Sequence, residues 1–156
     1  MIRECARGIK AIHLNDLDEC REIIAELDVK VKKLREIDEG LKNISDSCYQ
    51  EYVEIKCLLA VYEKQDWPMP EELGVPPLAF LNGLADCSGE LRRGIQLALR
   101  AGDKKQAEYL FEKLNEIYDN LMLLKFSASL VGGLKRKQDV LRGQIEQARS
   151  EMLRSG

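Results

Sequence analysis

The chain has 156 residues, a length that fits one domain spanning residues 1–156 and able to bury about two-thirds of the surface that its unfolded chain exposes. It carries 24 Lys and Arg residues against 27 Asp and Glu residues, and the net charge of -3 excludes a protein that binds nucleic acid through an overall positive potential. The sequence contains neither a run of about 18 apolar residues nor a secretory signal pattern, so it indicates no membrane span and no export.

Apolar residues recur with a helical period almost throughout the chain, and alternating strand patterns are absent, which predicts an all-α protein. The first helix is expected over residues 2–13. Asn15 and Asp16 offer N-cap chemistry for a second helix, which we expect to end at Gly40. A third helix is predicted from about residue 45 to residue 64.

Residues 66–77 contain all four prolines and form the only strongly non-helical segment, because proline lacks an amide proton and clashes with the preceding helical turn. We interpret this segment as a structured loop. A fourth helix then extends over about residues 77–100 and ends at Gly102, and Asp103 caps a fifth helix over about residues 104–124.

The last helix is predicted over about residues 128–153, with a kink near Gly132 and Gly133. From Lys125 onward, seven basic residues stand against three acidic ones, so this helix is expected to carry a basic face. The whole pattern predicts a single-domain antiparallel bundle of about six helices.

Five cysteines are scattered along the chain, and none forms a Cys-x-x-Cys pair: Cys5, Cys20, Cys48, Cys57 and Cys87. An odd number with this spacing disfavours a secreted disulfide framework and a thiolate zinc site. We interpret the cysteines as small buried hydrophobic residues of a protein in the reducing cytoplasm.

Two acidic pairs at helical spacing are the candidate functional residues. Glu51 and Glu54 lie at i,i+3, and Asp86 and Glu90 at i,i+4, so each pair occupies one side of its own helix. The same spacing elsewhere in the chain fits an ordinary solvated helix face. Glu51 and Glu54 differ because they lie on or beside the expected buried stripe, where a carboxylate needs a partner or a metal.

Asp86 and Glu90 share a helix face with three glycines, Gly83, Gly89 and Gly94. Each glycine inside a helix costs roughly 1 kcal/mol relative to alanine, so close approach by a helix, a backbone or a ligand is the expected compensation. Two interpretations stay open: glycine-mediated helix packing beside ordinary surface acids, and a groove lined by carboxylates.

A bound divalent cation would relieve the repulsion within such a cluster, which is roughly 3 kcal/mol for two carboxylates about 5 Å apart at an effective dielectric constant of 20. Ligands that are all oxygen favour Mg²⁺ or Mn²⁺ over zinc or copper. A di-iron bundle needs Glu-x-x-His pairs, and the sole histidine, His13, has no such partner. One histidine without a nucleophile elbow also disfavours a Ser-His-Asp or Cys-His site.

The run Phe80-Leu-Asn-Gly-Leu-Ala-Asp-Cys-Ser-Gly-Glu-Leu-Arg-Arg93, followed by Ala101-Gly-Asp103 and a long helix, resembles the central signature of the translin and translin-associated factor X (TRAX) family. Glu51-Tyr-Val-Glu54 resembles the Glu-x-x-Glu that the catalytic TRAX side carries and plain translin lacks. The resemblance covers nearly the whole chain. Within the family, the sequence most resembles a minimal prokaryotic, archaeal-type TRAX-like member.

This resemblance implies a translin-like α-α superhelix that assembles into closed oligomers, with a homo-oligomeric octamer favoured and a second translin-like subunit as the alternative. It also implies an endoribonuclease that uses Mg²⁺ or Mn²⁺ and acts on single-stranded RNA. Single-stranded DNA is a further candidate binding partner. The carried-over site comprises Glu51, Glu54, Asp86 and Glu90. Family members usually have a longer first helix than the one that begins here near Arg3, so we expect contacts made by that segment to differ.

Five basic residues are candidates for holding RNA: Arg92, Arg93, Lys135, Arg136 and Lys137. For the two arginines the alternative is an ion pair within the helix, and for the other three it is a solvated helix face. Two other functions stay open as well, a non-catalytic translin-like oligomer that binds single-stranded nucleic acid and a structural helical adaptor.

Overall fold

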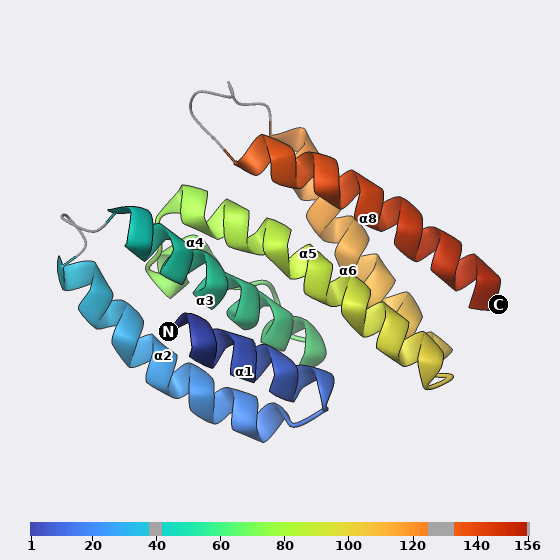
Figure 1. Cartoon of the computed structure of the whole chain (residues 1–156), viewed down its shortest axis with the longest axis horizontal. Helices are drawn as coiled ribbons and strands as arrows, with labels where there is room; N and C mark the ends of the chain where they lie inside the picture. The colour runs from blue at the N-terminus through green and yellow to red at the C-terminus, as the bar shows by residue number, and fades with distance from the viewer. Residues whose placement is uncertain (38–41, 125–132, 156) are drawn as a thin grey trace. The chain divides into compact units, whose positions relative to one another are not determined.

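A computed structural model of the chain describes residues 1–37, 42–124 and 133–155, and within these ranges the chain is helical with no strand (Figure 1). The all-α prediction is confirmed. The helices are α1 (Ile2–His13), α2 (Leu17–Ile37), α3 (Lys42–Tyr62), α4 (Pro70–Leu73), α5 (Pro77–Arg100), α6 (Lys104–Leu123) and α8 (Leu134–Ser155). No helix in this described part of the chain combines the length and apolarity needed to span a bilayer.

The chain packs as two compact units, Met1–Leu84 and Ala85–Gly156. Helix α5 begins in the first unit and ends in the second. The two units are defined by how their residues contact one another, and this division does not test whether the chain is one domain. The single domain over residues 1–156 therefore stays a prediction.

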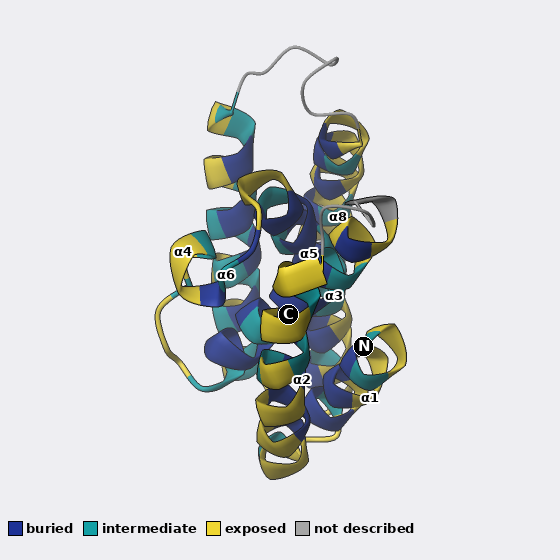
Figure 2. Ribbon diagram, turned by 90° about the vertical axis from the view of Figure 1, so that its left-hand side faces the viewer, coloured by how far each residue is buried: buried dark blue, intermediate teal, exposed yellow. Residues whose placement is uncertain are grey.

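In the first unit, α1, α2 and α3 pack against one another in pairs. Helices α1 and α2 bury an apolar stripe at helical spacing and expose their opposite sides, as the dark blue and yellow bands of Figure 2 show, whereas α3 has no exposed residue from Tyr49 to Tyr62. The buried side chains include Ile9 and Ile12 of α1, Ile23 and Leu27 of α2, and Ile55 and Leu58 of α3. A polar contact joins α3 to α2, where the Tyr52 hydroxyl donates to Asp28 Oδ1 at 2.6 Å.

Glycine allows a close approach between α5 and α3. A Cβ atom at Gly83 would lie 2.5 Å from the backbone oxygen of Gln50 and 2.7 Å from the Cβ atom of Val53, distances that real Cβ atoms do not adopt. At Gly89, the nearest atom would be Nε2 at the far end of the Gln144 side chain, at 3.3 Å. The expectation that glycine in this helix marks a close approach is therefore confirmed most strongly at Gly83.

In the second unit, α6 packs against α8. Both helices bury residues with alternating steps of three and four, which is the pattern of coiled-coil packing. The buried positions are Ala107, Leu110, Leu114, Ile117 and Leu121 in α6 and Leu134, Gln138, Leu141, Ile145 and Ala148 in α8. The buried Gln138 amide donates to the Leu121 carbonyl oxygen at 2.6 Å, so its polar group is satisfied.

The predicted helix boundaries hold where caps and breakers lie next to the helix. α1 and α5 have the expected ends, Gly102 adopts a φ of 77°, and Asp103 accepts a hydrogen bond from the Gln106 amide at 3.0 Å as the N-cap of α6. Gly40 and residues 128–132 of the predicted last helix lie outside the described residues, as does Gly132 of the expected kink.

The prediction of a wholly non-helical segment over residues 66–77 is wrong in part, because the short helix α4 lies inside it. Pro70 occupies the first helical turn, where its missing amide proton costs nothing. Glu72 accepts a hydrogen bond from the Met69 amide at 2.9 Å, and Gly74 ends the helix with a φ of 63°.

We expect Gly83→Ala to lower the free energy of unfolding by about 1–3 kcal/mol, because the new methyl group must push backbone and Cβ atoms of α3 away. Gly89→Ala is the matched control in the same helix, where the gain in helix propensity is about 1 kcal/mol and only the end of Gln144 must move. Urea unfolding followed by circular dichroism measures both. Equal stability of the two variants would contradict the close approach at Gly83.

Candidate functional site

Glu51 and Glu54 lie one turn apart on α3, and both side chains are half-buried. Their charges act on two cysteine thiols. Burial, and then the negative charge of Glu51, raise the pKa of Cys5 in α1 to about 12, and burial followed by the charge of Glu54 raises the pKa of Cys57 to about 12. These thiols therefore stay protonated at neutral pH.

Asp86 on α5 is held by a cation from α8. Lys137 Nζ donates to Asp86 Oδ2 at 2.5 Å, and the two side chains are 27% and 37% exposed. Glu90 forms a looser pair with Arg93, at 3.6 Å and one turn along the same helix. The Asp86–Lys137 contact is therefore shorter than the Glu90–Arg93 contact.

The α3 acid pair, Glu51 and Glu54, belongs to the first unit, and the α5 acid pair, Asp86 and Glu90, to the second. Among the residues that the structure describes, no group of three or more His, Cys, Asp or Glu side chains is placed to hold a metal ion. Convergence of the two pairs on one cation therefore stays a prediction.

The two arginines predicted to hold RNA differ in their surroundings. Arg92 Nη2 donates to Glu151 Oε1 of α8 at 2.7 Å, and Gln96 Nε2 donates to the same oxygen at 2.9 Å. Arg92 is half-buried, whereas Arg93 is 57% exposed and joins only loosely to Glu90. Arg92 thus joins α5 to α8 within the second unit. Arg93 is the arginine that is accessible to a polyanion.

Lys135 and Arg136 on α8 are exposed, and Lys135 lies 3.9 Å from Asp139 on its own helix. Arg136 and Lys137 line a pocket of about 370 Å³ together with Asp86 and Gln144. This pocket brings a predicted metal ligand into the same place as two predicted RNA-binding residues, all within the second unit.

Sequence reasoning did not find the polar seam between α5 and α8, which consists of the contacts Asp86–Lys137, Ser88–Gln144 and Arg92–Glu151. In the second of these three contacts, the Ser88 hydroxyl donates a hydrogen bond to Gln144 Oε1 at 2.6 Å. The α8 members are spaced by seven residues, which places them on one side of a helix. That spacing is the sequence signal from which the seam could have been predicted.

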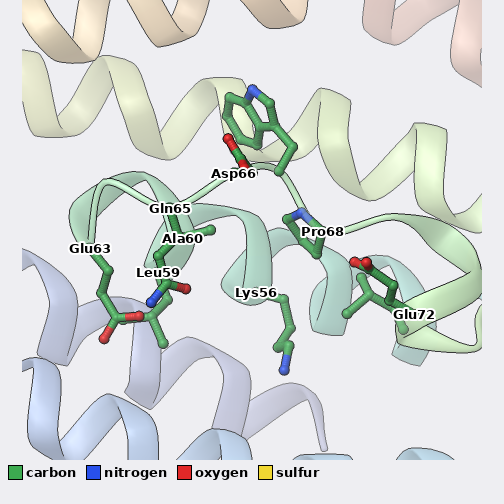
Figure 3. Close-up of a pocket in the computed structure, with 10 residues that line it drawn as sticks. Lys56, Leu59, Ala60, Glu63, Gln65, Asp66, Pro68 and Glu72 are labelled. Atoms are coloured by element: carbon green, nitrogen blue, oxygen red, sulfur yellow. The ribbon is translucent and has the colours of Figure 1, made fainter.

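A second pocket, of about 400 Å³, lies in the first unit between the end of α3, the proline-containing loop and α4 (Figure 3). Its charged wall residues Lys56 and Glu63 are joined to α2, Lys56 to Asp28 at 3.4 Å and Glu63 to Arg21 at 2.6 Å. The pocket contains none of the four predicted ligands and is therefore not the predicted site.

No family model matches the chain. An uncharacterised protein of Methanocaldococcus jannaschii is 30% identical over 155 residues, which are 97% of this chain and 69% of that protein.

Among solved structures, Archaeoglobus AfC3PO in complex with duplex RNA is 34% identical and has a TM-score of 0.88, over 99% of this chain and 82% of that one. A crystal structure of AfC3PO is 35% identical, with a TM-score of 0.87 over 97% of this chain and 82% of that one. Neurospora apo-NeC3PO is 23% identical and is similar in fold, with a TM-score of 0.89 over 99% of this chain and 83% of that one.

We expect Arg92→Gln to lower the free energy of unfolding by about 1–2 kcal/mol at pH 7, because it leaves the half-buried Glu151 carboxylate without its ion partner. Burial alone would raise the pKa of Glu151, but hydrogen bonds from Arg92 and Gln96 outweigh it and hold the pKa below its usual value of 4.5. The stabilisation is therefore present above about pH 4.5 and is lost as the pH falls through the folded-state pKa.

Chemical unfolding at pH 7 and at lower pH tests this prediction, with Arg93→Gln as the exposed control. An equal loss of stability in both variants, or a loss from Arg92→Gln that does not shrink on acidification, would contradict the assigned role of the Arg92–Glu151 pair.

Proposed function

This chain belongs to the translin/TRAX family, and from that premise we propose that it is a divalent-metal-dependent endoribonuclease that acts on single-stranded RNA. The proposed ligands are Glu51, Glu54 and Asp86, with Glu90 as a further ligand or as a hydrogen-bond acceptor beside them. The observation that carries the proposal is the contact of Gly83 with the turn of α3 that contains the first acid pair.

That contact supports a shared site through helix geometry. Gly83 touches Gln50 and Val53, and these residues directly precede Glu51 and Glu54 in the sequence. Asp86 and Glu90 follow Gly83 by three and seven residues in the same uninterrupted helix, which are positions on the same side of a helix. We infer that Asp86 and Glu90 lie on the same side of α5 as Gly83.

The donor set fits a hard cation. All four candidate ligands are carboxylates, and the pKa values of Cys5 and Cys57 keep these thiols protonated. When bound, Mg²⁺ or Mn²⁺ supplies a Lewis acid that lowers the pKa of a coordinated water and neutralises charge on the phosphate oxygens. The half-buried positions of Glu51 and Glu54 limit the water around these carboxylates, which strengthens their interaction with a cation.

The basic residues of the second unit supply the RNA contacts in this proposal. Arg93, Lys135 and Arg136 are exposed cations, and Lys and Arg side chains bind nucleic acid mainly through its phosphates. A local basic surface reconciles RNA binding with a net charge of -3. The complex of AfC3PO with duplex RNA supports RNA as the polymer, and we extend it to single strands and to a homo-oligomer, with an octamer favoured.

We expect Glu54→Gln to reduce cleavage of labelled single-stranded RNA in Mn²⁺ by at least about 100-fold. Even the loss of a group that only hydrogen-bonds to a metal ligand typically lowers metal affinity or activity by about 10–100-fold. Glu108→Gln on the exposed side of α6 is the matched control and should cleave as the wild type does. A duplex of the same sequence, offered in parallel, measures the preference for single strands.

Equal cleavage by wild type and Glu54→Gln, or RNA binding without cleavage by either, would defeat the nuclease assignment. The second of these results would favour the alternative function, a non-catalytic oligomer that binds single-stranded nucleic acid.

Excess Mg²⁺ or Mn²⁺ should stabilise the fold, because an ion that binds the folded chain alone adds about 2.7 kcal/mol at a hundredfold excess over its Kd. Thermal unfolding with and without Mn²⁺ measures the effect. The shift in Tm should be large in the wild type and in Glu108→Gln, and small in Glu54→Gln. A shift of the same size in all three proteins would place the ion elsewhere.

A further inference from the structure

The contact between Lys137 and Asp86 joins a cation to a proposed metal ligand. Lys137 Nζ lies 2.5 Å from Asp86 Oδ2, within hydrogen-bond distance, and both groups are only partly exposed. They line the same pocket of about 370 Å³, beside the exposed Arg136. The ammonium group of Lys137 is therefore a cation in direct contact with the Asp86 carboxylate.

We propose that Lys137 is a displaceable counter-cation for Asp86: it neutralises this carboxylate in the metal-free protein, and a divalent ion must replace it in order to bind. This inference rests on the proposed role of Asp86 as a metal ligand. Lys137 is a positioning residue in this scheme, because it acts through Asp86 and sets the affinity for the metal.

The energetics of the contact suit an exchange. A partly buried carboxylate needs a counter-charge, and the ammonium supplies it. An ion pair between side chains this exposed stabilises the protein only slightly. Exposed pairs typically change the equilibrium constant of folding by a few-fold at most. A divalent ion that gains several carboxylates at once can therefore displace the single charge of Lys137.

The Lys137 side chain can move away from Asp86 readily. Its ammonium is a strongly hydrated point charge on a flexible four-carbon stem, unlike the rigid planar guanidinium of arginine. The pocket of about 370 Å³ that Lys137 lines gives the displaced ammonium room to move.

The packing of α8 does not depend on this ion pair. The other two contacts of the polar seam, Ser88–Gln144 and Arg92–Glu151, join α8 to α5 at 2.6 Å and 2.7 Å. The apolar residues of α8 pack against α6 as well. Replacement of Lys137 by methionine, which keeps the length of the stem and removes the charge, should therefore leave the fold intact.

The experiment measures the Kd of Mn²⁺ by calorimetry for the full chain and three variants. We expect Lys137→Met to bind Mn²⁺ about two- to fivefold more tightly than the wild type, the fold-change equivalent to an ion pair of this exposure. Lys135→Met removes a charge from the same helix at a residue whose ion pair is with Asp139, so its Kd should match the wild type. Lys137→Arg keeps the charge and should not bind more tightly than the wild type.

A double-mutant cycle shows whether the effect passes through Asp86. In an Asp86→Asn background, Lys137→Met should no longer tighten Mn²⁺ binding, because the counter-ion has lost its carboxylate. Melting temperatures give an independent readout. Loss of a displaceable counter-ion lowers Tm only without Mn²⁺, whereas loss of a purely structural ion pair lowers it equally with and without the ion.

An unchanged or weaker Mn²⁺ affinity in Lys137→Met, or the same tightening in the Asp86→Asn background, overturns the proposal. Either result leaves the proposed function intact if the wild type still binds Mn²⁺ and cleaves RNA. If the wild type binds no Mn²⁺ at all, both the counter-ion role and the metal-dependent function fail.

Discussion

The missing side chain at Gly83 is the constraint on which the candidate site depends. Without a Cβ atom, the backbone of α5 can reach within contact distance of the Gln50 carbonyl and of Val53 in α3. Any larger residue would hold the two helices apart at the turn that carries Glu51 and Glu54. The conformational cost of a glycine within a helix is thus offset by a packing distance that no other residue allows.

In the second unit, α5 contacts α8 through the polar seam. Its three contacts are polar or ionic, whereas the contact of α8 with α6 is mostly apolar apart from the buried Gln138, so α8 has one largely hydrophobic side and one side that reaches α5. Ion pairs and hydrogen bonds of this kind add less stability than apolar burial, but they fix the register of one helix along another. The register of α8 decides which basic side chain meets Asp86.

Much of the fold follows from local sequence signals, because helix caps, breakers and apolar periodicity act over a few residues. The ends of α5 agree with the sequence because Pro77 and Gly102 lie beside them. The short helix α4 does not follow from the proline content of its segment, because proline breaks a helix interior but is tolerated in the first turn, where Pro70 lies.

The site was predictable only in part, for a physical reason. The spacing of each acid pair is local, so the sequence reveals it. The partner of Asp86 lies 51 residues further along the chain, and the seven-residue spacing on α8 does not by itself show which residue of α5 each α8 side chain meets. The roles of Arg92 and Arg93, which are adjacent in sequence, separate only when the position of Glu151 is known, because one of them turns toward α8 and the other toward solvent.

The protonated thiols beside Glu54 and Glu51 have a consequence for metal selectivity. A pKa of about 12 leaves only about one thiolate in 10⁵ at pH 7 for Cys5 and for Cys57. Zinc and copper, which out-compete manganese and magnesium at most nitrogen and sulfur sites, would have to expel a proton from each thiol that they recruit. Burial, with a smaller contribution from the charges of Glu51 and Glu54, therefore keeps these sulfur atoms in the form that zinc and copper bind least, which favours a hard ion at the proposed site.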